Sequence, residues 1–311
     1  MKTVSFFSYK GGAGRSTLAY NVIPLLAKNH LQPTAEEPMI VVDTDVDSCG
    51  MSYLLGAEDK VTEDNCVQYL LGNPFDRKRY KCLEDHPFLS KLIPVGNAFG
   101  YDEDEAILLL PAKDNKVINK GGKSNYAEAD GSSFQAALNS FVNVCRDLNV
   151  SAIVFDSSVG NTALANISNE ASDIIVCVMR PTLQFVNGTK RYLTALENGE
   201  KLTGSGKNIV LVPNVIPQNE VTIGNAIYPG AAVDKIMNMF VRSPLFKNSP
   251  TNTYHMGMLD DAEAFGIPAV DSFMWIEGLL HTKKTLNGTE QVALQRYKKL
   301  AGIINDIETD D

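Results

Sequence analysis

The sequence predicts an α/β protein in which a mostly parallel, twisted sheet is flanked by helices in three layers. Short apolar runs rich in Val, Ile and Phe alternate along the chain with longer segments of helical periodicity, which is the pattern of strands joined by crossover helices. The apolar runs are continuous and not alternating, so we expect the strands to be covered on both faces. A chain of 311 residues, of which 44% are hydrophobic and 21% charged, is long enough for one large core.

Six apolar runs are the candidates for strands. They cover residues 3–8, 39–42, 106–110, 152–155, 174–178 and 209–212. Runs of this length bounded by turn residues are typical of buried strands. Because parallel strands end at the same edge of a sheet, residues that follow these runs are the first candidates for a ligand site.

Apolar residues at helical spacing predict four helices. The first begins near Ser16 and carries Leu18, Val22 and Leu25 on one stripe, and we expect Pro24 to kink it. The other three are expected near residues 134–148, 184–197 and 288–307.

The domain organisation is expected to be a single domain over residues 1–311, because no linker composition divides the chain. Two stretches, 57–105 and 215–264, lack a clear period. The first is charged and holds a basic run at 77–79, and the second is rich in Pro, Gly, Asn and Met. We interpret both as insertions at the functional edge of the sheet or as interaction surface.

A glycine-rich loop lies directly between the first strand and the first helix. Residues 8–17 read Ser-Tyr-Lys-Gly-Gly-Ala-Gly-Arg-Ser-Thr. Phosphate binding needs backbone N–H groups that converge on an anion, which glycine permits, and the helix N-terminus adds its dipole. We expect Arg15 to balance the β- and γ-phosphates and the Ser16 hydroxyl to ligate Mg²⁺. The alternative is a turn that only closes the corner between strand and helix.

The run Lys10-Gly-Gly-x-Gly-[Lys/Arg]-Ser-Thr resembles the deviant Walker A motif of the ParA and MinD family of ATPases, which are P-loop NTPases of the SIMIBI type. In that family a second lysine, matched by Lys10, reaches across a nucleotide-sandwich homodimer to the partner's phosphates. A solvated surface lysine is the alternative. The resemblance implies that ATP is bound by Gly11, Gly12, Ala13, Gly14, Arg15, Ser16 and Thr17.

Two positions of the loop depart from the family. Tyr9 replaces the first glycine of an ordinary P-loop, which the deviant class tolerates, and Arg15 stands where most members have lysine. Arginine keeps the charge but is a wide planar fork, unlike the compact ammonium of lysine. We therefore expect nucleotide binding with slow hydrolysis, in which Lys10, Arg15 and Asp45 are the catalytic candidates.

Aspartates follow two of the predicted strands. Asp43 and Asp45 resemble the Asp-x-Asp of the family's first switch, which implies that Asp43 supports Mg²⁺ through water and that Asp45 orients the attacking water. Asp156 ends its strand like a Walker B aspartate and completes a metal set with Ser16 and Asp43. The prolines that the family often places after these aspartates are missing here.

Asn214 follows the run at 209–212 and resembles the family's adenine-contacting asparagine. An amide side chain can pair with the N6 and N7 edge of adenine, which favours ATP over GTP. A turn-forming asparagine is the alternative.

The composition argues against several kinds of protein. The five cysteines are scattered without a CxxC pair, so neither a disulfide framework nor an iron–sulfur cluster like that of nitrogenase iron proteins is expected. No run approaches the roughly 18 apolar residues of a membrane helix. The first apolar run is too short for a signal peptide, and we expect a cytoplasmic protein.

The first function hypothesis is an ATP-dependent dimerising switch that acts in DNA partition or intracellular positioning and is released by a stimulating partner protein. The net charge of −9 means that non-specific DNA binding needs a local basic patch. The candidates for that patch, whose alternative is a solvated polar face, are Lys283, Lys284, Arg296, Lys298 and Lys299.

Other function classes stay open. The second hypothesis is a TadZ-like scaffold or regulatory protein that binds ATP and dimerises with little or no hydrolysis. Membrane positioning as in MinD is disfavoured, because the chain ends Glu308-Thr-Asp-Asp, which suits no anionic lipid surface. Amidoligases or synthetases with related loops are a further alternative.

Overall fold

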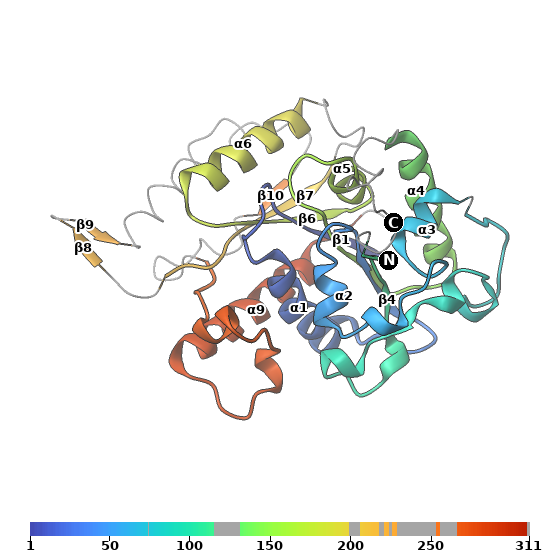
Figure 1. The fold of residues 1–311 in the computed structure, drawn as a ribbon, viewed down its shortest axis with the longest axis horizontal. Helices are drawn as coiled ribbons and strands as arrows, with labels where there is room; N and C mark the ends of the chain where they lie inside the picture. Colours follow the sequence, from blue (N-terminus) through green and yellow to red (C-terminus); the bar gives the residue numbers. More distant parts are fainter. Residues whose placement is uncertain are drawn as a thin grey trace.

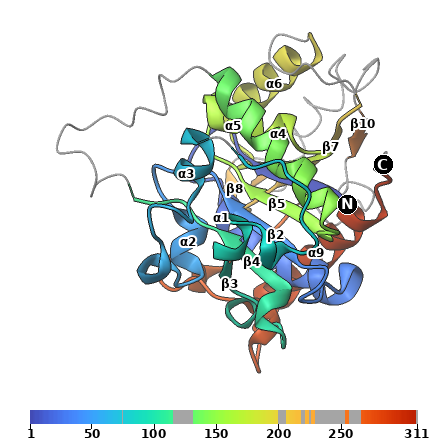
Figure 2. The ribbon, with the colours of Figure 1, turned by 90° about the vertical axis from the view of Figure 1, so that its right-hand side faces the viewer.

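The structure is a computed structural model that describes residues 1–73, 75–114, 131–198, 206–217, 221–223, 226–228, 253–255 and 266–309. Within these residues an eight-stranded sheet runs through the middle of the molecule, with helices on both of its faces (Figure 1). The view turned by 90° shows the same three layers from the side (Figure 2). The predicted fold class, a mostly parallel sheet flanked by helices, is therefore confirmed.

The strands of the large sheet follow the order β10-β7-β6-β1-β5-β2-β4-β3. All pairs in it are parallel except β3 with β4, which is antiparallel. The strands are β1 (Lys2–Phe7), β2 (Met39–Asp43), β3 (Ile93–Pro94), β4 (Ile107–Leu110), β5 (Ala152–Asp156), β6 (Ile174–Met179), β7 (Asn208–Pro213) and β10 (Thr253–His255), and a separate antiparallel pair is formed by β8 (Val221–Ile223) and β9 (Ala226–Tyr228).

The α-helices of the described residues are α1 (Arg15–Leu26), α2 (Gly50–Leu54), α3 (Val67–Gly72), α4 (Gly131–Asp147), α5 (Ala163–Glu170), α6 (Leu183–Glu197) and α9 (Gly288–Asp306). Four of them lie where the periodicity predicts them, namely α1, α4, α6 and α9, and α2, α3 and α5 were not predicted. Short 3-10 helices lie at Glu58–Lys60, Leu83–Asp85, Leu89–Lys91, Asn97–Phe99, Asp104–Ala106, Asp271–Met274 and Leu280–Thr282. Helices α1, α2 and α9 lie on one side of the sheet, and α4, α5 and α6 lie on the other (Figure 1).

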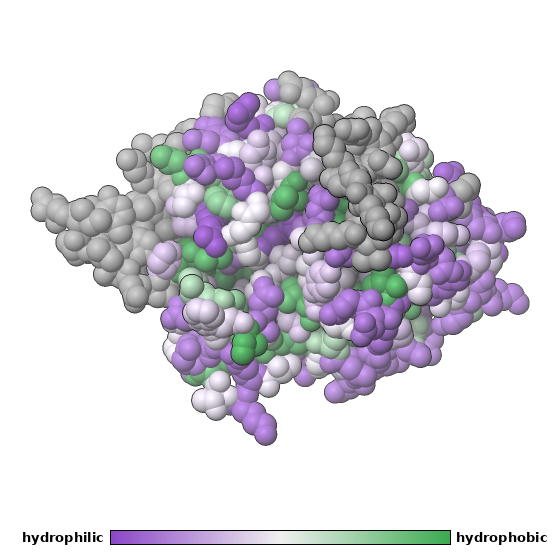
Figure 3. Space-filling view, viewed as in Figure 1, coloured by the Kyte–Doolittle hydropathy of each residue, from purple (hydrophilic) through white to green (hydrophobic). Residues whose placement is uncertain are grey.

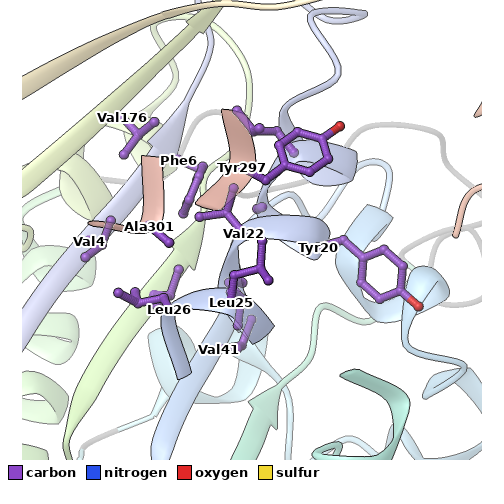
Figure 4. Close-up of a cluster of buried hydrophobic side chains, with 14 of the residues drawn as sticks. Val4, Phe6, Tyr20, Val22, Leu25, Leu26, Val41, Val176, Tyr297 and Ala301 are labelled. Carbon is purple, nitrogen blue, oxygen red and sulfur yellow. The ribbon is translucent and has the colours of Figure 1, made fainter. Parts of the chain in front are cut away.

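The first strand shows how the layers are joined. Val4 and Phe6 point toward α1 and α9, whereas Phe7 stacks on Tyr192 of α6 with ring centroids 4.4 Å apart. Alternate residues of a strand face opposite sides, so both faces of β1 are covered by apolar side chains. Figure 4 shows the cluster on the α1 side, which contains Val4, Phe6, Tyr20, Val22, Leu25, Leu26, Val41, Val176, Tyr297 and Ala301.

The first helix does not stop at its proline. Pro24 lies inside α1, and the chain then continues as a π-helix over Ala27–Leu31, where the N–H of Ala27 bonds to the carbonyls of Ile23 and Pro24. A proline has no N–H to give to the preceding turn, which loosens the regular bonding pattern around it. The chain passes from an α-helix into a π-helix three residues after Pro24, and the kink expected at Pro24 stays a prediction.

The two irregular stretches differ in how much of them the structure describes. Residues 57–105 bury apolar side chains such as Leu70, Phe88 and Leu89 in the same cluster as Phe141 of α4. This stretch is thus packed into the main core through short helices and the edge strand β3. Most of 215–264 lies outside the described residues, so the prediction of a single domain with two insertions stays a prediction.

Candidate functional site

The carboxyl ends of five parallel strands meet at one edge of the sheet, because β1, β5, β2, β6 and β7 all run in the same direction. The glycine-rich loop follows β1, and Asp43 and Asp156 are the last residues of the adjacent strands β2 and β5. Arg180 follows β6 and Asn214 follows β7. Such an edge is where open α/β sheets bind ligands.

The glycine-rich loop has the backbone of an anion cradle. Gly12 and Gly14 have φ values of 80° and 74°, the left-handed conformation that glycine adopts without strain. A Cβ on Gly14 would also collide with the amide nitrogen of Asn214, whereas one on Gly12 would meet nothing. Helix α1 starts immediately after Gly14 and has no side-chain cap, so its first N–H groups stay available for an anion.

Two hollows border the glycines of this loop. One has a volume of about 480 Å³ and is lined by the loop, by Asp45 and Asp47, and by Glu277. The other, of about 420 Å³, is lined by Asn214, Arg180 and Asp271 among others. Gly12, Gly14 and Thr17 border both hollows, so the loop separates a compartment lined by many hydroxyl and carboxylate side chains, called here the polar compartment, from one with more aliphatic and aromatic side chains.

Arg15 is buried among the aspartates at the strand ends. Its Nε donates to Asp156 Oδ1 at 2.6 Å, and its Nη2 donates to Asp45 Oδ2 at 2.8 Å. The same Nη2 lies 3.3 Å from the Ser16 hydroxyl oxygen. The side chains of Arg15 and Asp156 are 5% and 0% exposed, which makes this a fully desolvated ion pair. The opposite charges of Asp156 and Asp45 outweigh burial, and the pKa of Arg15 is raised.

Asp43 is buried beside this cluster and is held by other donors. One carboxylate oxygen accepts from the backbone N–H and the hydroxyl of Ser52, at 2.9 and 2.8 Å, and the other accepts from the N–H of Asp45 at 3.1 Å. Burial first, and then the charge of Asp156, raise the pKa of Asp43 to about 7. Burial also raises the pKa of Asp156, against the lowering effect of Arg15.

The predicted magnesium ligands Ser16, Asp43 and Asp156 are close together but are not arranged as an open metal site. Both oxygens of Asp43 accept protein hydrogen bonds, and Arg15 binds one oxygen of Asp156 and contacts Ser16. Within the part of the chain that the structure describes, no group of three or more His, Cys, Asp and Glu residues is placed to hold a metal ion. In this conformation the oxygen atoms of these side chains are arranged to bind a guanidinium and do not fit Mg²⁺.

The first half of the loop faces a different helix. Lys10 is exposed, and its Nζ lies 3.1 Å from Gln184 Oε1 of α6. The ring of Tyr9 packs on Gly188 of the same helix so closely that any Cβ there would overlap it. Neither residue borders the compartment that contains Asp45. The structure therefore places Lys10 at the rim of the site and not among its own aspartates.

Asn214 is tied to the glycine-rich loop. Its Nδ2 donates to the carbonyl oxygens of Ala13 and Gly14, at 2.9 and 3.3 Å. This amide thereby holds the loop against the end of β7, and it also borders the second hollow. The role predicted for it toward adenine stays a prediction.

Sequence reasoning missed three polar residues at the site. Arg180 directly follows the apolar strand β6, so it could have been found in the same way as Asp156, as a polar residue at the end of a predicted strand. Asp271 borders the second hollow, and Glu277 accepts a hydrogen bond from the Thr17 hydroxyl at 2.9 Å. No local signal marks these two, because they reach the site from a segment 260 residues away along the chain.

The segment that carries Glu277 also exposes apolar side chains. Met274, Trp275 and Ile276 are 76%, 86% and 77% exposed. On the face drawn in Figure 3, hydrophobic residues occur in small groups among hydrophilic ones. Three consecutive exposed apolar residues beside the site are therefore a local departure from the surface around them.

The basic residues considered for DNA contact lie on or just before α9. Lys283 forms an ion pair with Glu290 at 2.7 Å, where Glu290 also closes the capping box of α9 with Asn287. Its charge is therefore partly compensated, and DNA binding by this group stays a prediction. Among the described helices, none has the length and apolar character required to cross a lipid bilayer.

Solved structures with similar folds were found, although the sequence matches no protein-family model and no curated protein. An aspartate variant of Cyanothece McdA in complex with ATP is 13% identical, with a TM-score of 0.60 over 98% of this chain and 95% of that chain. Aquifex aeolicus MinD in its complex with MinC is 15% identical, with a TM-score of 0.57 over 100% and 99%.

A third similar structure is a biosynthetic enzyme. Cobyrinic acid a,c-diamide synthase from Mycobacterium smegmatis, with bound ADP and magnesium, is 14% identical, with a TM-score of 0.57 over 97% of this chain and 93% of that chain. Similarity at this level of identity establishes a common fold and leaves activity to the site itself. This chain has the fold of the ParA- and MinD-like P-loop proteins.

Proposed function

We propose that the chain binds ATP at the loop of residues 8–17 and acts as a ParA- and MinD-like dimerising switch with slow hydrolysis. One observation carries the proposal: a loop with left-handed glycines leads into an uncapped helix N-terminus, between two hollows at the carboxyl edge of a parallel sheet. Backbone N–H groups in this arrangement suit the phosphates of a nucleotide.

The two hollows suggest how the nucleotide would lie. The polar compartment next to Asp45 suits the phosphates, and the compartment next to Asn214 and Phe273 suits the nucleoside. The McdA relative holds ATP and the synthase holds ADP with magnesium, which supports a nucleotide as the ligand. Magnesium ligation by Ser16, Asp43 and Asp156 is a prediction that the position of Arg15 constrains.

The surroundings of Lys10 support the dimeric part of the proposal. The ammonium lies at the rim and its described partner is the neutral side chain of Gln184. An exposed hydrogen bond of this kind contributes little free energy, so Lys10 can leave Gln184 and bind a phosphate held by a second copy of the chain. Partition of DNA or positioning of another cargo, with release by a stimulating protein, is the cellular role that we propose for such a dimer.

The scaffold reading, in which ATP is held with little hydrolysis, is favoured by the ion pair between Arg15 and Asp45. Asp45 is the residue proposed to orient water, and its Oδ2 already accepts hydrogen bonds from Arg15 and from the Ser48 hydroxyl, which leaves it less free to bind a water molecule. Turnover near zero together with tight ATP binding is the result expected for a scaffold. Amidoligase chemistry would instead require ATP consumption that depends on a carboxylic acid and an amide donor.

Calorimetry and gel filtration test the proposal. ATP should bind the purified full chain and shift its elution toward a dimer. Lys10→Ala should abolish the shift and keep ATP binding, whereas Asp45→Ala should prolong the dimer. Lys60→Ala, an exposed lysine in the 3-10 helix Glu58–Lys60, is the matched control and should behave like the unmodified chain. Absence of binding heat with every nucleotide would contradict the proposal.

A further inference from the structure

We infer that Arg15 is the resident cation of the acidic cluster at the ends of β2 and β5, and that it excludes divalent metal ions from the nucleotide-free protein. The inference deepens the proposed function, since it concerns the same site. It rests on the contacts of Arg15 alone, and its test does not need a nucleotide.

The first argument is geometric. The end of β2 lies beside the end of β5, with Asp43 paired in register with Asp156. The guanidinium spans this gap, because Nε reaches Asp156 while Nη2 reaches Asp45. A planar fork with several donors can bind two carboxylates at once, which a single ammonium does less well. One side chain therefore neutralises a carboxylate at the end of β5 and another in the loop that follows β2.

The second argument is competition for oxygens. Mg²⁺ requires close, near-octahedral contact with oxygen ligands. Arg15 donates to Asp156 Oδ1 and to Asp45 Oδ2, and it contacts the Ser16 hydroxyl. Asp45 Oδ2 also accepts from the Ser48 hydroxyl at 2.8 Å. A metal ion at this cluster would share these oxygens with a second cation in a water-excluded place, where repulsion is strong.

The third argument is that the cluster keeps unused hydrogen-bonding capacity. Within the described residues, Arg15 Nη1 and Asp156 Oδ2 are buried and have no hydrogen-bond partner. Buried polar atoms in native proteins are rarely left unpaired unless the site changes its partners. Arg15 also borders the polar compartment proposed for the phosphates. Phosphate oxygens there would give the guanidinium new acceptors and would release the carboxylates.

The test is a titration of the nucleotide-free full chain with Mn²⁺, read by the electron paramagnetic resonance signal of the free ion. The unmodified chain should show no binding up to millimolar Mn²⁺. Arg15→Gln removes the charge and leaves a shorter polar side chain, and it should bind Mn²⁺ at least about tenfold more tightly. The double variant R15Q with Asp156→Asn should lose that gain, which assigns the ion to this cluster.

Three outcomes decide the inference. Mn²⁺ binding by the unmodified chain as tight as that by R15Q would overturn it, and so would a folded R15Q that gains no binding. Should circular dichroism show R15Q to be unfolded, Arg15→Met removes the charge and keeps an unbranched side chain that fills part of the space, and a gain in Mn²⁺ binding is again required. Calorimetry with ATP and with ADP on the unmodified chain separates the two proposals: absence of binding heat with both nucleotides removes the proposed function and leaves the Mn²⁺ result valid.

Discussion

The two halves of the glycine-rich loop carry one cation each, and the two cations lie in opposite surroundings. Lys10, in the first half, is exposed and contacts a neutral amide of α6. Arg15, in the second half, is buried and bonded to Asp156 at the end of β5 and to Asp45, two residues beyond the end of β2. Although the two residues are only five positions apart, Lys10 is a surface cation with one neutral partner and Arg15 is a buried cation held by two carboxylates.

This difference shows that a motif specifies which residue types are present but not what each one contacts. The first half of the loop contacts α6, where the Tyr9 ring packs on Gly188 and the Lys10 ammonium bonds to Gln184. The second half contacts the aspartates at and just beyond the ends of β2 and β5 through Arg15. A change in either half should therefore have a different consequence for stability and for association, and the four predictions below test that expectation.

The largest effect is expected for Arg15→Ala. Removing the cation leaves two carboxylates without their buried partner, and the free energy of unfolding should fall by about 3–5 kcal/mol. Urea unfolding followed by circular dichroism measures this loss. Lys10→Ala is the control from the other half of the loop and should change the free energy of unfolding by less than about 0.5 kcal/mol. Equal losses of unfolding free energy in the two variants would contradict the difference described between the two halves of the loop.

A smaller loss is expected for Gly188→Ala, because the new methyl group would overlap the ring of Tyr9. Overpacking of this kind costs about 1–3 kcal/mol of unfolding free energy. The double variant G188A with Tyr9→Ala should recover part of that loss, which distinguishes a clash with the ring from a general helix effect. Gly72→Ala in α3, where a Cβ meets nothing, is the matched control, and its unfolding free energy should stay the same or rise slightly.

The pH dependence should follow the carboxylates of the second half. The pKa of Asp43 is raised to about 7, so the folded chain holds a proton on Asp43 that the unfolded chain has released. The contribution of Asp43 to stability is present at acidic pH and is lost as pH rises from the unfolded pKa of Asp through about 7. Between pH 5 and pH 8 the unfolding free energy should fall, on the order of 1 kcal/mol.

Urea unfolding at several pH values measures this slope. The charged neighbours of Asp43 that shape it are Asp45, Asp156 and, through these, Arg15. Asp43→Asn should make the slope shallower over this range. An unfolding free energy that rises from pH 5 to pH 8 equally in both proteins would contradict the expectation.

The smallest effect is expected for Gln184→Ala, which removes the described contact of Lys10. An exposed hydrogen bond of this kind should change the unfolding free energy by less than about 0.5 kcal/mol. Lys10 keeps its charge, so ATP-dependent dimerisation should persist, with a dissociation constant changed by at most about threefold. Analytical ultracentrifugation with ATP measures this dissociation constant. Loss of the dimer would mean that the dimer requires the contact between Lys10 and Gln184, as the second half of the loop requires the contacts of Arg15.

Much of the fold could be predicted from local pattern, because buried parallel strands are continuous apolar runs. The six predicted runs correspond to β1, β2, β4, β5, β6 and β7 within a few residues. β3 was missed because Ile93–Pro94 is a two-residue antiparallel edge, too short to produce a pattern. β10 was missed because Thr253–His255 pairs at the opposite edge and is only partly buried.

The site could be predicted less completely, since strand ends locate residues but not their partners. The run order alone brings Asp43, Asp156 and Asn214 to one edge, where the structure has them. The contacts of Arg15 with Asp156 and Asp45 depend on the distance between β2 and β5 and on the exclusion of water from the space between them. Neither property can be predicted from the sequence of the loop. Likewise Asn214 proved to be a brace for the loop carbonyls, a contact that its spacing did not indicate.

The exposed segment beside the site gives the molecule a built-in optical probe. Trp275 is the one tryptophan of the chain, it is 86% exposed, and it lies two residues before Glu277, which bonds to Thr17 at the end of the loop. Its emission should therefore be that of a solvent-exposed indole in the free protein. Any ligand or second subunit that covers this segment would shift the emission to the blue, with no other indole to mask the change and no label to attach.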